Sequence, residues 1–176
     1  MKDMNKIILR GRIVHLYNTG KNSYVVTIDD GQNNFIKVFI CDRVNTSIIK
    51  NYKVNDCLEI EGNLQSAIRE DVKRPPTIFC EKINEYPRYD MRTKNDFVIQ
   101  GTVKKVCVIN NDCWRITVST FVNEHYSVIP IIVYNPDVRL YNQEPGEKIC
   151  IYGEVQTVKK YGENRKPVYY QNFVAK

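Results

Sequence analysis

The stretch Leu58–Ser66, which reads Leu-Glu-Ile-Glu-Gly-Asn-Leu-Gln-Ser, is the best guide to the fold because the chain contains it twice. Its counterpart is Ile149–Thr157, with the sequence Ile-Cys-Ile-Tyr-Gly-Glu-Val-Gln-Thr. In both copies apolar residues alternate with others, as in a strand that buries one face. A glycine inside such a strand indicates a bulge, a bend or a point where a side chain would be in the way. We therefore predict a bent or bulged strand in each copy, at Gly62 and at Gly153.

Matches on both sides of this stretch indicate an internal duplication. The run Ile7–Ile13 matches Phe97–Val103, and Phe35–Ile40 matches Val128–Val133, at nearly the spacing that separates the two glycines. The spacing changes only between apolar runs. Insertions and deletions therefore fall in loops, as expected of two copies of one fold.

The composition is that of an ordinary globular protein, since 43% of the 176 residues are hydrophobic and 26% are charged. No apolar run reaches the roughly 18 residues of a membrane span, and the first residues lack a signal-peptide core. We therefore expect a cytoplasmic protein with no membrane partner. The net charge of +6 permits a polyanionic partner without requiring one.

The cysteines and histidines form no recognisable metal-binding or catalytic pattern. The six cysteines include no Cys-x-x-Cys pair and mostly lie in strand-like runs, which favours reduced, buried thiols. The two histidines, His15 and His125, have no partner at ligand spacing. The sequence also shows no Ser/His/Asp or Cys/His arrangement, no glycine-rich phosphate loop and no carboxylate cluster of recognisable spacing. We expect a protein without metal or cofactor that is not an enzyme.

Residues 1–86 have the element order of one small domain: three strands, a short helix and two more strands. Polar residues 87–94 indicate a linker, and residues 95–176 repeat the order. This is the order of the OB-fold, a five-stranded, partly open barrel, so the predicted class is all-β with two tandem OB-folds. The predicted strands are 6–14, 24–29, 35–41, one containing Gly62, one ending near Ile83, 97–108, 112–121, 126–134, 147–157 and 166–175, with one helix capped by Asp42 that carries Val44, Ile48 and Ile49 and another near 136–143.

The residues themselves resemble one family. Asn5–Ile13, Phe35–Ile40 and Glu59–Ser66 are similar to the corresponding strands of bacterial single-stranded-DNA-binding proteins, and so are Val128–Tyr134 and Tyr152–Thr157 in the second unit. The resemblance covers nearly the whole chain and rests on the ordered set of runs. It implies non-catalytic, largely sequence-independent binding of single-stranded DNA in replication, recombination, repair or a mobile element.

The resemblance also bears on assembly. Members of the family typically work as four barrels, so a fused pair would reach that number as a homodimer. Outward-facing apolar residues such as Ile8, Phe39 and Ile132 would suit such an interface. The family usually has one OB unit and a tail whose acidic tip recruits enzymes, whereas this chain ends at Lys176 with no acidic C-terminal tail. DNA binding is therefore expected, and recruitment through a tail is not.

Strand alternation sorts the aromatic residues into core and surface. Trp114 and Tyr24 share the parity of neighbouring aliphatic residues and should lie in the core. In residues 35–40 the aliphatic residues should face inward, so that Phe35, Lys37 and Phe39 face outward as a row of ring, cation and ring. Such a row would stack bases, although a packed subunit interface would use it equally well. By the resemblance, Phe35 stands at a frequent stacking position and Lys37 at a frequent cationic one.

In the second unit the predicted binding surface on the third strand is weaker than in the first unit, and the predicted binding loop between strands four and five is stronger. That loop has a tyrosine among four cations, whereas the first unit's loop has cations without a ring. Which of Phe79, Tyr169 and Tyr170 face outward stays open. The candidate nucleic-acid-binding residues are Arg12, Phe35, Lys37, Phe39, Arg69, Lys73 and Arg74 in the first unit, and Arg115, Tyr134, Lys159, Lys160, Tyr161, Arg165, Lys166 and Tyr169 in the second.

Two other functions remain open. A replication or primosome accessory protein could use tandem OB-folds mainly for protein contacts, which the modest charge and the apolar third strand of the second unit favour. An RNA-binding tandem OB protein cannot be separated by sequence, because contacts to the 2′-hydroxyl are not predictable from it.

Overall fold

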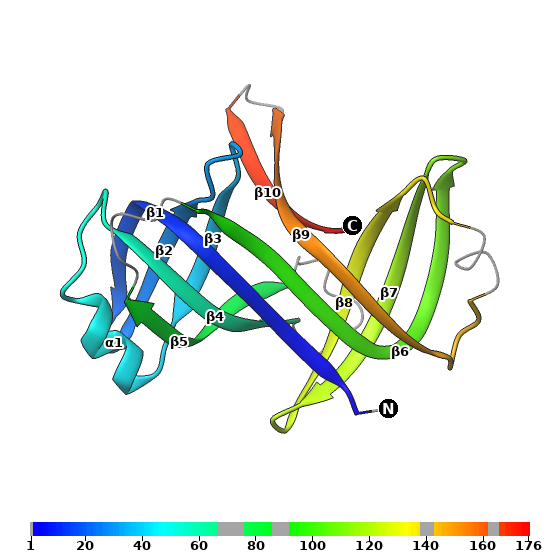
Figure 1. The fold of residues 1–176 in the computed structure, drawn as a ribbon, viewed down its shortest axis with the longest axis horizontal. Coiled ribbons are helices and arrows are strands. Elements are labelled where there is room, and N and C mark those ends of the chain that lie inside the picture. The colour runs from blue at the N-terminus through cyan, green and yellow to red at the C-terminus, as the bar shows by residue number, and fades with distance from the viewer. Residues whose placement is uncertain (1, 67–75, 86–91, 138–142, 162–165) are drawn as a thin grey trace. The chain divides into compact units, whose positions relative to one another are not determined.

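The computed structural model comprises residues 1–176 and describes them except for residues 1, 67–75, 86–91, 138–142 and 162–165 (Figure 1). The described residues form ten strands and one short helix, so the predicted all-β class is confirmed. The elements in chain order are β1 (Met4–Gly20), β2 (Ser23–Asp29), β3 (Phe35–Ile40), α1 (Arg43–Ile49), β4 (Cys57–Gln65), β5 (Thr77–Glu85), β6 (Lys94–Asn110), β7 (Cys113–Val122), β8 (His125–Tyr134), β9 (Lys148–Tyr161) and β10 (Pro167–Ala175).

The chain divides into two compact units. The N-terminal unit contains β1 from Lys6 onward, β2 to β5, and α1. The C-terminal unit contains β6 from Phe97 onward and β7 to β10, and it also takes in the chain up to Asn5 and the segment that begins at Gln65. The predicted domains 1–86 and 95–176, with their linker, remain a prediction that truncation at these positions would test.

Two short segments from the first half of the sequence belong to the C-terminal unit through side-chain hydrogen bonds. The Asp3 carboxylate accepts from the Phe121 amide at 2.9 Å and from Lys148 Nζ at 2.6 Å. Ser66 Oγ accepts from the Val128 amide at 2.7 Å. Burial acts to raise the pKa of Asp3, but the hydrogen bonds from Lys148 and Phe121 outweigh it and hold the pKa below its ordinary value.

The strands of each unit close into a ring of the same order. In the N-terminal unit β1 pairs antiparallel with β2 and β4, β2 with β3, and β3 pairs in parallel with β5, which lies next to β4. In the C-terminal unit β6 pairs antiparallel with β7 and β9, β7 with β8 and β9 with β10, while β8 and β10 are parallel. A ring of five strands in this order is the OB-fold.

The core of each unit comes from the inward face of its strands, as the alternation predicted. On β3 the side chains of Ile36, Val38 and Ile40 are fully buried. Trp114 is only 7% exposed, which confirms its core assignment, while Tyr24 is half-buried. In the C-terminal unit the rings of Phe97 and Phe173 meet edge to face with their centroids 6.0 Å apart. Further fully buried core residues are Ile7, Leu9, Ile13, Leu58 and Ile60 in the N-terminal unit and Ile99, Val103, Ile116, Val118 and Val155 in the C-terminal unit.

The paired glycines mark close approaches of two backbones. A Cβ at Gly62 would lie 2.2 Å from the Phe79 carbonyl oxygen, and one at Gly153 would lie 2.1 Å from that of Val174. The register of β4 on β1 and of β9 on β6 is regular up to each glycine and ends there, so the choice between a bend and a bulge stays a prediction. The sequence singled out these positions correctly because only glycine leaves room for the neighbouring strand.

The first strand is longer than predicted, because a bulge lets the alternation of inward and outward side chains continue past residue 14. The register between β1 and β2 shifts between Ile13 and His15, so Val14 is the extra residue, and β1 continues to Gly20. The predicted strand ended at residue 14, where period-two alternation stops. A bulge allows the outward positions to resume at His15 and Tyr17.

The helix α1 is capped as predicted. The Asp42 side chain accepts from the Asn45 amide at 2.8 Å. The Asn45 side chain donates to the Glu81 carbonyl and accepts from the Ile83 amide, both at 2.9 Å, and so fixes α1 to β5. Of the apolar residues that the predicted helix carries, Ile49 is fully buried, whereas Val44 is 70% exposed. Most of the second predicted helix, near 136–143, lies outside the described residues.

Candidate nucleic-acid interface

The outer face of β1, β2 and β3 brings most of the first unit's predicted strand residues together. Asp29 on β2 pairs with Arg12 on β1 and with Phe35 on β3. The next outward row runs from His15 through Thr27 to Lys37. Residues opposite each other in antiparallel strands share a face and lie about 4.5–5.5 Å apart at Cβ. Arg12, Phe35 and Lys37 therefore lie on one surface.

A third row continues this surface. Tyr17 pairs with Val25, and Val25 pairs with Phe39. Phe39 in turn lies beside Phe79 on β5, with ring centroids 5.9 Å apart, and both rings are half-buried. We call this surface the N-terminal platform, defined by Arg12, His15, Tyr17, Phe35, Lys37 and Phe39.

The platform has exposed rings and cations at its edges. Phe35 is 41% exposed and Tyr17 47% exposed, while Arg12 and Lys37 are exposed as well. Within the described part of the chain neither the Arg12 side chain nor the Lys37 side chain makes a hydrogen bond or an ion pair. Phe39 differs from this pattern, because Phe79 covers part of its ring. It supports the platform more than it offers a stacking surface.

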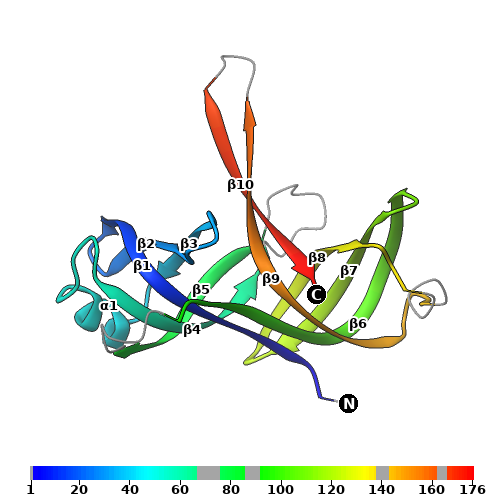
Figure 2. The ribbon, with the colours of Figure 1, turned by 45° about the horizontal axis from the view of Figure 1, so that its top comes forward.

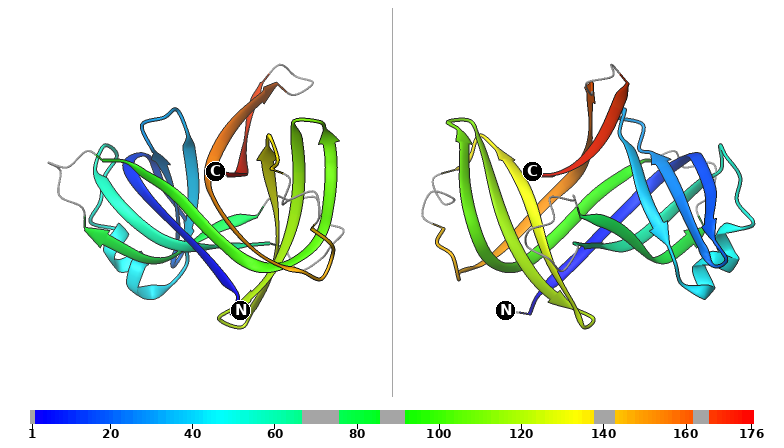
Figure 3. Two further views of the ribbon diagram at one scale, coloured as in Figure 1. Left: turned by 45° about the vertical axis from the view of Figure 1, so that its right-hand side comes forward. Right: turned by 180° about the vertical axis from the view of Figure 1, so that it is seen from behind.

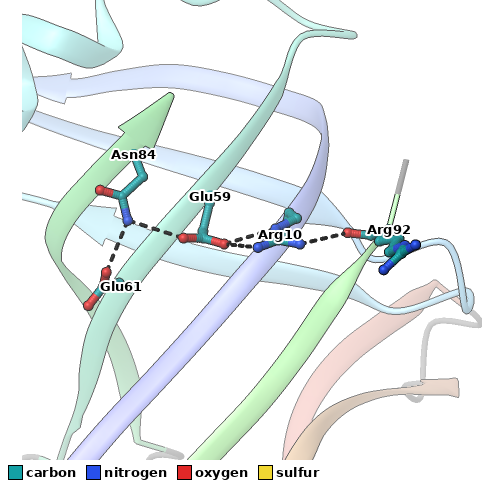
Figure 4. A network of polar contacts seen from close by, with 5 residues as sticks. All are labelled: Arg10, Glu59, Glu61, Asn84 and Arg92. Carbon is teal, nitrogen blue, oxygen red and sulfur yellow. Dashed lines mark hydrogen bonds and ion pairs between the residues drawn. The ribbon is translucent and has the colours of Figure 1, made fainter. Parts of the chain in front are cut away.

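A different set of charges on β1, β4 and β5 is neutralised internally (Figure 4). Arg10 donates two hydrogen bonds to one carboxylate oxygen of Glu59, at 2.8 and 2.6 Å, and one to the Arg92 carbonyl at 3.4 Å. The Asn84 amide then joins Glu59 to Glu61, at 3.1 and 3.0 Å. In this satisfied polar network the charge of Arg10 is neutralised by the carboxylate of Glu59.

Lys6 completes that pattern at the end of the network. Its ammonium lies 2.8 Å from Glu61, and hydrogen bonds from Lys6 and then Asn84 lower the pKa of Glu61. Lys6 and Arg10 are therefore paired, whereas Arg12, on the same strand, is not. A phosphate would have to displace a paired carboxylate at the first two positions. At the third, Asp29 lies opposite Arg12, but its carboxylate accepts from the Gly31 amide and forms no ion pair with Arg12.

The equivalent face of the C-terminal unit has a different composition. On β8 the outward residues Val128, Pro130 and Ile132 are half-buried. Arg115 on β7 is exposed and pairs with Ile132, and Tyr134 at the end of β8 is 52% exposed. Lys105, in line with Thr117 and Pro130, is exposed on the same face, and so are Phe121 and Tyr126, which pair with each other. The rings and cations of this face therefore lie around an apolar centre, and the weaker platform expected from the sequence stays a prediction.

The aromatic and cationic residues of the C-terminal unit gather instead on the β9–β10 hairpin. The pairing extends from Gly153 with Ala175 to Tyr161 with Pro167, beyond the stretch in which β9 also pairs with β6. The hairpin therefore continues past its own ring as a two-stranded ribbon (Figure 2). Both views of Figure 3 show it, in orange and red, reaching past the ends of β7 and β8.

The hairpin places lysines over tyrosine rings. Lys159 Nζ lies 5.0 Å from the centroid of Tyr161, and Lys160 Nζ lies 5.7 Å from that of Tyr170. A side-chain hydrogen bond with Tyr161, together with the nearby phenolic groups of Tyr161 and Tyr169, raises the pKa of Lys159. Tyr161 is 69% exposed and Tyr169 52% exposed.

The remaining predicted residues divide into two sets. Lys166 is exposed immediately before β10. Arg69, Lys73, Arg74 and Arg165 lie outside the described residues.

Sequence reasoning missed two residues of the platform and left one residue of the hairpin undecided. His15 and Tyr17 were not predicted, because the bulge at Val14 breaks the alternation that would have placed them. Tyr170, whose outward orientation the sequence left open, is 43% exposed.

The described residues contain no group of three or more His, Cys, Asp or Glu side chains that could hold a metal ion. In the same part of the chain, no helix is long and apolar enough to span a membrane.

Comparison with solved structures reveals a close match of fold. A deletion variant of the single-stranded DNA binding protein from Thermus aquaticus superposes with a TM-score of 0.69 at 11% identity, covering 99% of this chain and 92% of that one. The wild-type Thermus aquaticus protein gives a TM-score of 0.67 at 12% identity, covering 99% and 91%. No family model and no curated protein sequence matches. The chain thus has the SSB-like OB-fold at a sequence identity that shows the fold alone.

Proposed function

We propose that this protein binds single-stranded DNA, without catalysis and largely independently of base sequence. The observation that carries the proposal is the sorting of its charges. On the N-terminal platform, Arg12 and Lys37 lie beside exposed rings without an acidic partner among the described residues, whereas Lys6 and Arg10 are paired with carboxylates. The likeness in fold to a single-stranded DNA binding protein supports the same function.

The proposed mechanism combines stacking with phosphate contacts. Phe35, Tyr17 and Tyr161 expose ring faces, and base–aromatic stacking contributes about 1–3 kcal/mol per base for any base. Arg12, Lys37 and the hairpin lysines would contact phosphates and release counterions. Neither kind of contact reads a base edge, so we expect little sequence preference.

The internal duplication and the homodimer belong to the same proposal. Two rings of identical strand order support two copies of one domain, and two chains would supply four barrels. Ile8, Phe39 and Ile132, the apolar residues proposed for contacts between chains, are half-buried in the single chain. Light scattering at tens of micromolar should give the mass of a dimer, and a monomer mass would contradict this part. Roles in replication, recombination, repair or a mobile element fit this activity equally.

Titration with labelled oligonucleotides tests the main proposal. Oligo-dT should bind tightly, with an affinity that falls as salt rises between two concentrations, and mixed-sequence DNA of equal length should bind similarly. Oligo-rU is the second arm, because preferential binding of rU would instead support an RNA-binding tandem OB protein. Absence of salt-sensitive binding to dT of any length would end the proposal.

One observation favours a second candidate, a replication accessory that contacts other proteins. In the middle of β8 the outward residues are Val128, Pro130 and Ile132, which offer neither stacking rings nor phosphate contacts. If the N-terminal platform binds no nucleic acid, this apolar face becomes the surface to probe. The titration above therefore decides between the two candidates.

A further inference from the structure

The β9–β10 hairpin has two usable faces. In its register Tyr169 lies opposite Lys159, and Tyr170 lies opposite Val158. Successive residues of a strand point to opposite sides, so Tyr169 and Tyr170 lie on opposite faces of the ribbon. Residues two apart share a face, which places Tyr161 with Tyr169.

Each face has its own ring and its own cation. One face has Tyr161 and Tyr169 with Lys159, whose ammonium lies 5.0 Å from the Tyr161 ring centroid. The other has Tyr170 with Lys160, 5.7 Å from the Tyr170 ring centroid. The same combination of ring and cation therefore occurs twice on one ribbon.

Neither face is covered by a second layer of the unit. Tyr161 and Tyr169 are 69% and 52% exposed, and Tyr170 on the opposite side is 43% exposed. The pairing of β9 with β6 ends at Gly153, and β10 pairs with β8 at Val174, so the outer part of the ribbon, Val158–Tyr161 with Pro167–Tyr170, pairs only within the hairpin. In an ordinary OB-fold strand one face belongs to the core, whereas here both are accessible.

We propose that the hairpin binds two segments of single-stranded DNA at the same time, one on each face. The inference rests on the proposed function and adds to it, because a one-sided groove would hold a single segment. Bases of one segment stack on Tyr161 and Tyr169, and bases of the other stack on Tyr170. Lys159 and Lys160 contact the phosphates of their own face.

A purely structural role for the same pairs predicts different behaviour. A two-stranded ribbon is marginally stable in water, and cross-strand ring and cation pairs stabilise it. On that account Tyr170 would matter only by keeping β9 and β10 paired. Loss of Tyr170 would then expose the ribbon's amides to hydrogen exchange.

Tyr169 and Tyr170 provide matched variants because they are adjacent in sequence and opposite in space. The full-length protein is irradiated with oligo-dT that contains 5-iodouracil, and the cross-linked residues are identified by mass spectrometry with fragmentation. We expect chains cross-linked at both tyrosines. Tyr169→Ala and Tyr170→Ala should each weaken oligo-dT binding by about 5- to 150-fold, and their effects should multiply. Tyr169→Phe and Tyr170→Phe, which keep the ring, should each lose less affinity than the corresponding alanine variant.

Three results would each contradict the inference. If cross-links and affinity loss are confined to one tyrosine, the proposed binding of single-stranded DNA stands, but only one face of the hairpin binds it. Affinity loss in Tyr170→Ala that appears only together with faster amide exchange in β9 and β10 would assign the ring a structural role. Failure of the wild-type protein to bind oligo-dT would overturn the proposed function itself, and the inference with it.

Discussion

The two units have the same ring of strands but different outer faces. At the outward positions of β3 the N-terminal unit has Phe35 and Lys37, and at the matching positions of β8 the C-terminal unit has Val128 and Pro130. The C-terminal unit has its rings and cations on the β9–β10 hairpin instead. Ring topology depends on the inward residues, which both units retain, so the outward residues are free to differ.

The largest effect is expected where the two units are most alike. Gly62→Ala and Gly153→Ala would each place a Cβ about 2 Å from a backbone oxygen, which the strand cannot avoid without moving. Each substitution should lower the free energy of unfolding by at least about 1–3 kcal/mol, measured by denaturant unfolding.

Gly20→Ala is the matched control for these two variants. The nearest atom to its Cβ is the Ser23 hydroxyl at 3.0 Å, the end of a side chain that can rotate away. It should unfold within about 0.5 kcal/mol of wild type. If Gly62→Ala is harmless and Gly153→Ala is not, the two rings do not use their glycines in the same way.

The next effect separates the two outer faces. Phe35→Ala removes an exposed ring and should cost about 1–3 kcal/mol in the binding free energy for oligo-dT, with the salt slope nearly unchanged. Val128→Ala changes the matching position of the C-terminal unit and should leave affinity unchanged. Equal losses in both variants would show that the faces are functionally equivalent after all.

Trp114→Phe is the control for a core aromatic residue. Because Trp114 is 7% exposed, its substitution should lower the melting temperature more than the affinity. Loss of affinity at full stability would show that the tryptophan, and not the platform, contacts the DNA.

A smaller effect should distinguish unpaired from paired cations. Lys37→Ala or Lys160→Ala should each reduce the magnitude of the salt slope by about 0.7, the expected loss for one phosphate contact on a single strand. Lys6→Ala removes a lysine already paired with Glu61 and should leave the slope unchanged. The slope comes from binding constants measured over a series of salt concentrations.

The smallest expected effect is the pH dependence of one ion pair in each unit. Asp3 and Glu61 both have pKa values below the ordinary carboxyl range, so each stabilises the folded state above its unfolded pKa. That stability is lost as the pH falls through the folded pKa. At pH 7 Asp3→Asn or Glu61→Gln should each cost less than about 1 kcal/mol in unfolding free energy. The cost should disappear in acid once the pH lies below the folded pKa of each carboxyl, and a cost that persists there would mean that charge is not its source.

The sequence alone determined the fold and the core because both depend on local alternation. Ile36, Val38 and Ile40 could be assigned to the inside, and Trp114 with them, since a strand turns every second side chain toward the same face. The repeated glycines predicted where backbones come close.

Only the tertiary structure decided which outward residues share a surface and which charges are neutralised. Arg10 and Arg12 have the same parity on one strand, yet only Arg10 meets Glu59, a residue far away in sequence. The bulge at Val14 places Tyr17 on the same face as Phe35, and the pairing of β9 with β10 places Lys159 opposite Tyr169. Register and bulges are set by contacts between distant strands, which local periodicity does not contain.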